Sequence, residues 1–223
     1  MKSIFESLYG VKDALLSAGE MLGLLGIGVV VGIMGAIKKR KINLGWNSKK
    51  DKMFVEKHGR IHELLTELRV TIRASRCAIF QFHNGGSFAD GMSIKRFSVT
   101  HESCDTGTNS VLLESQDALV TRYLDVIAVM NESPGKIVAV SSLSPSAFRS
   151  CLEINSVEYF SVVPLRLFDG LTTLGFVCCH WRSADPLDEM EKEGITQNEL
   201  QELILNSVGN INSYFSINRR YGR

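Results

Sequence analysis

An uninterrupted apolar run, Met21–Ile37, constrains the fold of this 223-residue chain more than any other feature. As a helix it would rise about 25 Å, which approaches the thickness of the hydrocarbon core of a bilayer. A soluble amphipathic helix would carry a polar stripe, and this run has none. We therefore predict a transmembrane helix over residues 18–37, preceded by an amphipathic segment over residues 1–17.

Basic residues gather on one side of the predicted span. A basic linker follows it over residues 38–51, whereas the few lysines before the span are balanced by acids. The positive-inside rule then predicts a single-pass protein of the inner (cytoplasmic) membrane with its large C-terminal part in the cytoplasm. The net charge of the whole chain is only +1, which argues against a nucleic-acid partner.

Two patterns predict that the chain forms a homo-oligomer. Glycines within the span have the small-xxx-small spacing that lets two membrane helices approach closely. A predicted helix over 51–75 places apolar residues at alternating steps of four and three, as in a coiled coil, although this pattern is equally typical of the core face of a globular helix. The candidate oligomerisation residues are Gly28, Gly32, Phe54, Ile61, Leu65 and Leu68.

The five cysteines are odd in number and lack the spacing of a disulfide framework, so we expect reduced, mostly buried thiols. Cys178 and Cys179 are neighbours on a predicted strand and should point to opposite faces. A cysteine nucleophile needs a base within reach and an activated thiol. Two Cys/His pairings are conceivable in the sequence, His180 with Cys178 or Cys179 and His101 with Cys104, and neither meets these requirements. We therefore predict a protein that is not an enzyme.

The segment from Cys77 to Ser103 predicts a β-hairpin, because two β-rich runs flank a loop with several glycines. His83 would lie beside the loop and His101 at the far end, so the two histidines cannot share a metal ion. We predict no metal site. The candidate ligand-binding residues, at the rim of a pocket, are His83, Asn84, Arg96, His101 and Glu102.

The remainder of the chain predicts further elements. In chain order these are a helix over 110–131, a strand over 136–143, a long hairpin over 159–181 with its turn at Asp169-Gly170, an acidic loop over 185–194, and a final helix opened by a capping box at Thr196 and Glu199. Pro164 marks an edge or a bulge in the long hairpin. The first and last helices each present one apolar stripe, which predicts a two-layer α+β domain with both helices on one face of a mainly antiparallel sheet.

Residues 52–217 resemble a GAF domain, the PAS-related sensor fold, and residues 218–223 would form a tail. The resemblance rests on three motifs: Val163-Pro164-Leu165, Asp169-Gly170 and Leu174-Gly175-Phe176. It implies a sensor or binding module, since GAF domains bind cyclic nucleotides, tetrapyrroles, haem or small metabolites, or bind nothing. No residue set for one of these ligands stands out, so the cofactor stays unknown.

The layout of the whole chain is also similar to the lysis holin of T-even phages, which has a short N-terminal tail, one membrane span and one globular domain. That family keeps its large domain outside the cytoplasm, whereas the basic linker predicts the inside. The sequence therefore favours a membrane-anchored, non-enzymatic GAF-like sensor or binding module for a small ligand or protein partner. The alternative is a phage-type holin or other lytic membrane protein regulated by its globular domain.

Overall fold

The computed structural model of the protein describes residues 49–87, 91–167 and 169–216. The chain divides into two compact units, Met1–Lys52 and Met53–Arg223, and the fold below is that of the second. The predicted amphipathic segment, span, Gly28 and Gly32 lie outside the described residues. In the part of the chain that is described, no helix combines the length and apolar character needed to cross a membrane.

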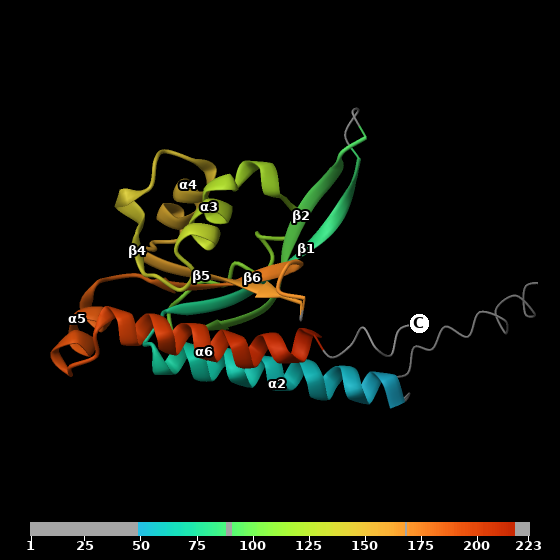
Figure 1. Ribbon diagram of the computed structural model, residues 1–223. Helices are drawn as coiled ribbons and strands as arrows, with labels where there is room; N and C mark the ends of the chain where they lie inside the picture. The colour runs from blue at the N-terminus through green and yellow to red at the C-terminus, as the bar shows by residue number, and fades with distance from the viewer. Residues whose placement is uncertain (1–48, 88–90, 168, 217–223) are drawn as a thin grey trace, which may run out of the picture. The chain divides into compact units, whose positions relative to one another are not determined.

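The second unit combines one antiparallel sheet with five α-helices and two short 3-10 helices within the described ranges (Figure 1). The strands are β1 (Arg76–Ser87), β2 (Ser93–Cys104), β3 (Ala118–Leu119), β4 (Val138–Ala139), β5 (Tyr159–Arg166) and β6 (Thr173–Trp181). The helices are α2 (Lys49–Thr71), η1 (Val120–Arg122), α3 (Leu124–Glu132), η2 (Val140–Ser142), α4 (Ala147–Ile154), α5 (Asp185–Lys192) and α6 (Gln197–Ser216).

Among the described residues the sheet has the strand order β3-β2-β1-β6-β5-β4, and its neighbouring strands all pair antiparallel. The two predicted hairpins, β1–β2 and β5–β6, are confirmed. They meet through the β1–β6 pair at the centre of the sheet, where Arg76 lies opposite His180 and Phe80 opposite Phe176. Pro164 fits its predicted edge position, since β4 pairs with β5 only at Phe160 and Tyr159.

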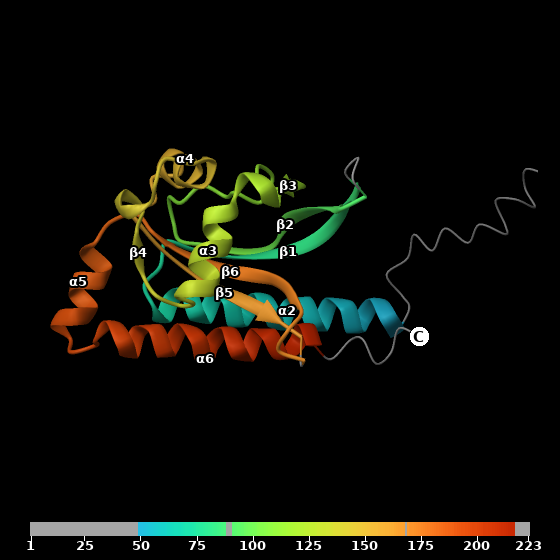
Figure 2. The same ribbon diagram turned by 45° about the horizontal axis from the view of Figure 1, so that its top comes forward.

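Helices cover both faces of the sheet, which corrects the prediction of two layers. As expected, α2 and α6 lie side by side on one face (Figures 1 and 2). The opposite face carries α3 and α4 (Figure 2). The prediction missed this third layer because α4 falls in a stretch that reads as a Ser/Pro loop, although Ser146 caps it by accepting a hydrogen bond from the Arg149 amide.

The central strands divide their side chains between two cores, because successive residues of a strand point to opposite faces. Cys77 and Ile79 contribute to the core under α2 and α6, which we call the helix-side core. Ala78 and Phe80 contribute to the core under α3 and α4, which we call the cavity-side core. The buried members of the helix-side core are Ile61, Leu65, Leu68, Ile72, Ala74, Cys77, Ile79, Val163, Leu165, Val177, Cys179, Trp181, Met190, Leu200, Ile204, Val208 and Ile211.

Two predicted elements are shorter than expected. The helix predicted over 110–131 is confirmed only in α3, because the chain before it forms turns, β3 and η1, and Asp117 adopts a positive φ of 56°. A helix cannot run through a left-handed residue. The strand predicted over 136–143 is reduced to the two residues of β4, and η2 follows directly.

The acidic segment 185–194 was predicted as a loop, and this prediction is wrong because Asp185–Lys192 forms α5. Its proline lies in the first turn, where a missing N–H costs nothing, and acids near the helix N-terminus favour the helix dipole. Met190 anchors α5 in the helix-side core.

The capping box of the last helix is confirmed. The Glu199 side chain accepts from the Thr196 amide at 2.8 Å, and the Glu199 amide donates to the Thr196 hydroxyl at 3.2 Å. This reciprocal pair satisfies two amides at the start of α6. It sets the direction in which α6 returns across the sheet beside α2.

Candidate functional site

A small cavity opens between the sheet and the α3–α4 layer. Water-sized groups can occupy about 40 Å³ of it, which is room for a few waters or a ligand of a few heavy atoms. It is lined by Arg76, Phe80, Phe97, Val111, Ser115, Ala118, Tyr123, Val126, Phe148, Cys151, Leu152, Asn155, Phe176, Cys178 and His180.

Aromatic rings form one wall of this cavity. Phe80 and Phe176, paired across β1 and β6, stack with ring centroids 4.7 Å apart, and Phe97 meets Phe176 edge-on at 5.6 Å. Such ring pairs are rigid and bury a large apolar area. The wall therefore keeps its shape when the cavity is empty, and it favours a ligand with a hydrocarbon part.

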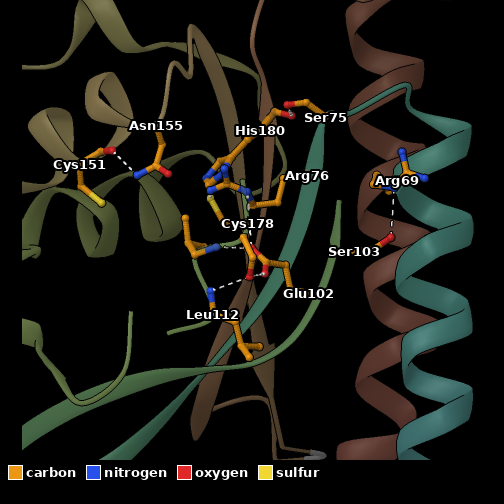
Figure 3. Close-up of polar contacts among 12 residues, drawn as sticks. Arg69, Ser75, Arg76, Glu102, Ser103, Leu112, Cys151, Asn155, Cys178 and His180 are labelled. Carbon is orange, nitrogen blue, oxygen red and sulfur yellow. Dashed lines mark hydrogen bonds and ion pairs between the residues drawn. The ribbon is translucent and has the colours of Figure 1, made fainter. Parts of the chain in front are cut away.

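Arg76 places a buried cation in the lining of the cavity, near Cys178 and His180 (Figure 3). It is the first residue of β1, and only 2% of its surface is exposed. Its Nε and Nη1 atoms find no hydrogen-bond acceptor among the residues that the structure describes. Buried polar groups normally have partners, and each unmade bond costs about 1–3 kcal/mol. Two open donors on one buried guanidinium are therefore an unusual feature.

Glu102, on β2, is the counter-charge of Arg76, but it does not satisfy these donors. The distance from Arg76 Nε to Glu102 Oε1 is 3.6 Å, too long for a good hydrogen bond. The carboxylate instead accepts from the Val111 amide at 2.9 Å and from the Ser110 hydroxyl. Glu102 thus neutralises the charge of Arg76 while it holds the loop at one side of the cavity.

Cys178 and His180 lie two residues apart on β6, so both face the cavity, and Cys178 Sγ is 3.0 Å from His180 Nε2. Burial raises the pKa of the Cys178 thiol well above its usual value. Burial, with Arg76 nearby, lowers the pKa of His180 to about 3. Both groups are therefore neutral at pH 7, and the pair is not arranged as the thiolate and imidazolium of a cysteine nucleophile.

The neutral Cys178 thiol and the neutral His180 ring share one hydrogen bond, in which either the thiol donates to Nε2 or Nε2–H donates to Sγ. His180 Nδ1 is buried and has no partner within the described ranges. In the tautomer in which the thiol donates, Nδ1 carries the ring proton and adds a third open donor to the two of Arg76.

A second depression, lined in part by Arg149 and Glu153 near η2 and α4, is larger, at about 290 Å³. Two of its charged residues, Arg149 and Glu153, already pair with each other. Arg149 Nε donates to Glu153 at 2.7 Å, and Arg149 Nη1 donates to the Leu143 carbonyl at 2.6 Å. We therefore regard the smaller cavity at Arg76 as the candidate site.

The structure separates the residues that the sequence grouped at a pocket rim. His83, Asn84 and Arg96 lie together on the β1–β2 hairpin, away from the lining of the cavity. There His83 Nε2 is 2.9 Å from the Ser98 hydroxyl, and Arg96 binds the Asp117 side chain at 2.7 Å. These contacts hold the hairpin to the loop before β3.

His101 and Glu102 point to opposite faces of the sheet. Glu102 meets Arg76 beside the cavity. His101 instead faces α2, where its Nε2 lies 2.8 Å from His58 Nδ1. In the described part of the chain, Glu102 is the one candidate rim residue whose side chain forms an ion pair or hydrogen bond with residues that line the cavity, Arg76 and Val111. Within the same ranges, no group of three or more metal-ligating side chains could hold a metal ion.

The contact of His58 with His101 predicts a loss of stability in acid. Burial, followed by His58, His62 and Lys57, lowers the pKa of His101 to about 4. Below pH 6.5 His101 therefore binds a proton in the unfolded chain but stays neutral in the folded chain. The free energy of unfolding falls progressively as the pH drops from about 6.5 to 4. We expect His101 to account for on the order of 1 kcal/mol of the loss between pH 7 and pH 5.

Urea unfolding of the wild type and of His101→Gln at both pH values measures this contribution. The variant should lose less stability on acidification than the wild type. An unchanged pH dependence in His101→Gln would contradict the assignment.

The candidate oligomerisation residues divide between the core and the surface. Ile61, Leu65 and Leu68 are at most 1% exposed and belong to the helix-side core, which is the alternative that the sequence left open for this seam. Phe54 is 53% exposed at the start of α2, beside Met53. The seam of α2 is thus occupied within its own chain along most of its length.

Sequence reasoning did not select Arg76, because a lone arginine before a β-rich run is typical of a solvated strand end. The contacts that bury Arg76 appear only in the folded structure. The amide and the hydroxyl of its neighbour Ser75 both donate to the His180 carbonyl, at 2.9 and 2.8 Å (Figure 3). These bonds draw the start of β1 against the end of β6. Arg76 is buried as a result.

Comparisons with known proteins found remote structural likenesses. No family model and no curated protein matches the chain. Among solved structures, the chain is similar to a nitrate-binding-site mutant of NreA from Staphylococcus aureus, with 18% identity over 60% of this chain and 91% of that one, at a TM-score of 0.43. It is also similar to the phycoerythrobilin-bound GAF domain of a cyanobacterial phytochrome. The two share 16% identity over 74% of this chain and 98% of that one, at a TM-score of 0.41. The PixJ GAF domain of Thermosynechococcus elongatus shares 14% identity with this chain, over 76% of this chain and 96% of that one, also at a TM-score of 0.41. The architecture described above rests on the strand pairings of this chain itself.

Proposed function

We propose that the described domain is a GAF-like sensor module that binds one small molecule in the cavity at Arg76 and does not transform it. The observation that carries this proposal is the combination of an aromatic wall with buried donors that have no partner among the described residues. Apolar pockets with a few converging polar groups are typical of ligand sites. The neutral state of Cys178 and His180 favours binding over covalent chemistry.

A fragment panel tests this function. The panel contains neutral, cationic and anionic molecules of no more than about eight heavy atoms, and ligand-observed NMR on the full-length protein in mild detergent detects binding. We expect hits that are lost in Cys151→Phe, because Cys151 lines the cavity from α4 and a ring there would fill it.

Ser150→Phe is the matched control, since Ser150 is exposed on the same helix and does not line the cavity. The control should keep every hit that Cys151→Phe loses. If no fragment binds the wild type, or if both variants bind as it does, the cavity is not a ligand site.

We also propose that the span over 18–37 anchors this module to the cytoplasmic membrane and that the protein self-associates there. The apolar run and the basic linker support the anchor and its orientation. Protease added outside intact cells should leave the C-terminal domain uncut, and digestion from outside would refute the orientation.

For self-association, Gly28→Ile with Gly32→Ile should reduce the dimer or oligomer fraction measured in mild detergent. A wild-type protein that weighs as a monomer would overturn it.

A further inference from the structure

We propose that the ligand of this cavity is a short-chain carboxylate, bound with its anionic oxygens at Arg76 and His180 and its hydrocarbon part against the aromatic wall. This inference rests on the proposed function, because it names the chemical class that the same cavity would take. It follows from three properties of the site: which hydrogen-bonding roles are open, how the guanidinium of Arg76 is paired, and how much space there is.

The open roles at the buried end of the cavity are donors. Arg76 has no acceptor for Nε or Nη1 within the described residues, and an arginine side chain can only donate. His180 Nδ1 is also buried without a partner, and it donates in the tautomer in which the Cys178 thiol donates to Nε2. A bound group that completes these bonds must offer acceptor atoms. A ligand ammonium group would leave all of them open and would add a like charge beside Arg76.

The unmade hydrogen bonds of the Arg76 guanidinium favour a charged acceptor over a neutral one. Glu102 offsets the charge of Arg76 from 3.6 Å, but its oxygens already accept from Val111 and Ser110. The guanidinium therefore has a counter-charge nearby without hydrogen bonds to it. Charge-assisted bonds from a guanidinium to a carboxylate are roughly twice as strong as neutral ones, and this strength increases where water is excluded.

The size and lining of the cavity favour a short organic anion. The space of about 40 Å³ admits only a few heavy atoms. Beyond Arg76 and His180 the walls are mainly apolar, and Val126, Leu152 and Phe148 line the cavity from α3 and α4. A fully polar oxyanion would be desolvated against these walls without compensation. A carboxylate with a short hydrocarbon tail matches both the polar groups of Arg76 and His180 and the apolar walls.

Calorimetric titration of the full-length protein in mild detergent with propionate and with propionamide tests the proposal. The two molecules have nearly the same shape and differ in charge. We expect propionate to bind at least about ten-fold more tightly than propionamide at matched ionic strength. Hexanoate should bind more weakly than propionate because the cavity cannot hold its longer chain.

The double variant Arg76→Met/Glu102→Gln removes both charges together, so it leaves no buried charge unpaired. It should bind propionate no more tightly than propionamide, and circular dichroism checks that it is folded. Comparison of the two ligands on the wild type does not depend on any variant. Equal affinity for both, or a failure of both to bind, overturns the carboxylate class. Fragment hits that are lost in Cys151→Phe would still support the proposed function in that case, whereas an absence of hits would overturn both.

Discussion

Gly175→Ala is expected to destabilise the domain more than any other single methyl group that we could add. Gly175 lies in β6 between β1 and β5, opposite Gln81 on one side and Leu165 on the other. A β-carbon at this position would overlap the Phe80 carbonyl oxygen and lie only 2.9 Å from the α-carbon of Gln81. The obstacle is backbone, which hydrogen bonds hold in the centre of the sheet. We expect a loss of about 4 kcal/mol in the free energy of unfolding, at the upper end of point-mutation effects.

Urea unfolding of the full-length protein in detergent, followed by tryptophan fluorescence, measures this loss, since Trp181 is fully buried at the end of β6. Gly209→Ala is the matched control. Gly209 lies within α6 with open space around its α-carbon, so alanine should stabilise the helix by up to about 1 kcal/mol. Equal stability of the two variants would show that β1 and β6 do not approach as closely as described.

Glu102→Gln should give the second largest effect, because it leaves Arg76 as a buried cation without a counter-charge. The glutamine oxygen can still accept from the Val111 amide, so the change acts mainly on charge. Breaking a buried pair by removing one partner costs about 3–5 kcal/mol, whereas removing both partners is often nearly neutral. We expect a loss of about 3 kcal/mol for the single variant.

Adding Arg76→Met to Glu102→Gln should recover most of this loss, and a double-mutant cycle in urea gives the coupling energy. Arg60→Met with Glu63→Gln is a matched control on an exposed ion pair of α2, and its coupling should stay below about 1 kcal/mol. Additive effects at Arg76 and Glu102 would mean that the two charges do not interact in the folded protein.

The elements that the sequence predicted well are those with local signals. The β5–β6 hairpin was predicted from its Asp169-Gly170 turn, and the Asp169 side chain indeed accepts from the amides of Leu171 and Thr172. The capping box of α6 is equally local. By contrast, α4 and α5 were missed because each is only eight residues long, which is too short for a clear helical period.

The candidate site could not be predicted in the same way, because its parts come together only through strand pairing. Arg76 and His180 are directly opposite in the β1–β6 register, although they are far apart in the sequence. Glu102 reaches the same place through the β1–β2 register. Alternation along β2 predicts that His101 and Glu102 face opposite sides, and this rule alone would have split the candidate rim.

Comparing methyl signals from the two cores during a ligand titration tests most directly the central claim that the cavity at Arg76 is a ligand site. Methyl-labelled full-length protein in detergent is titrated with propionate and followed by NMR. We predict that the methyl signals of Val126 and Leu152, in the cavity-side core, shift with saturation. The signals of Leu65 and Ile204, across the sheet in the helix-side core, should stay in place. Shifts confined to the helix-side core, or no saturable shift at Val126 and Leu152, would contradict the account.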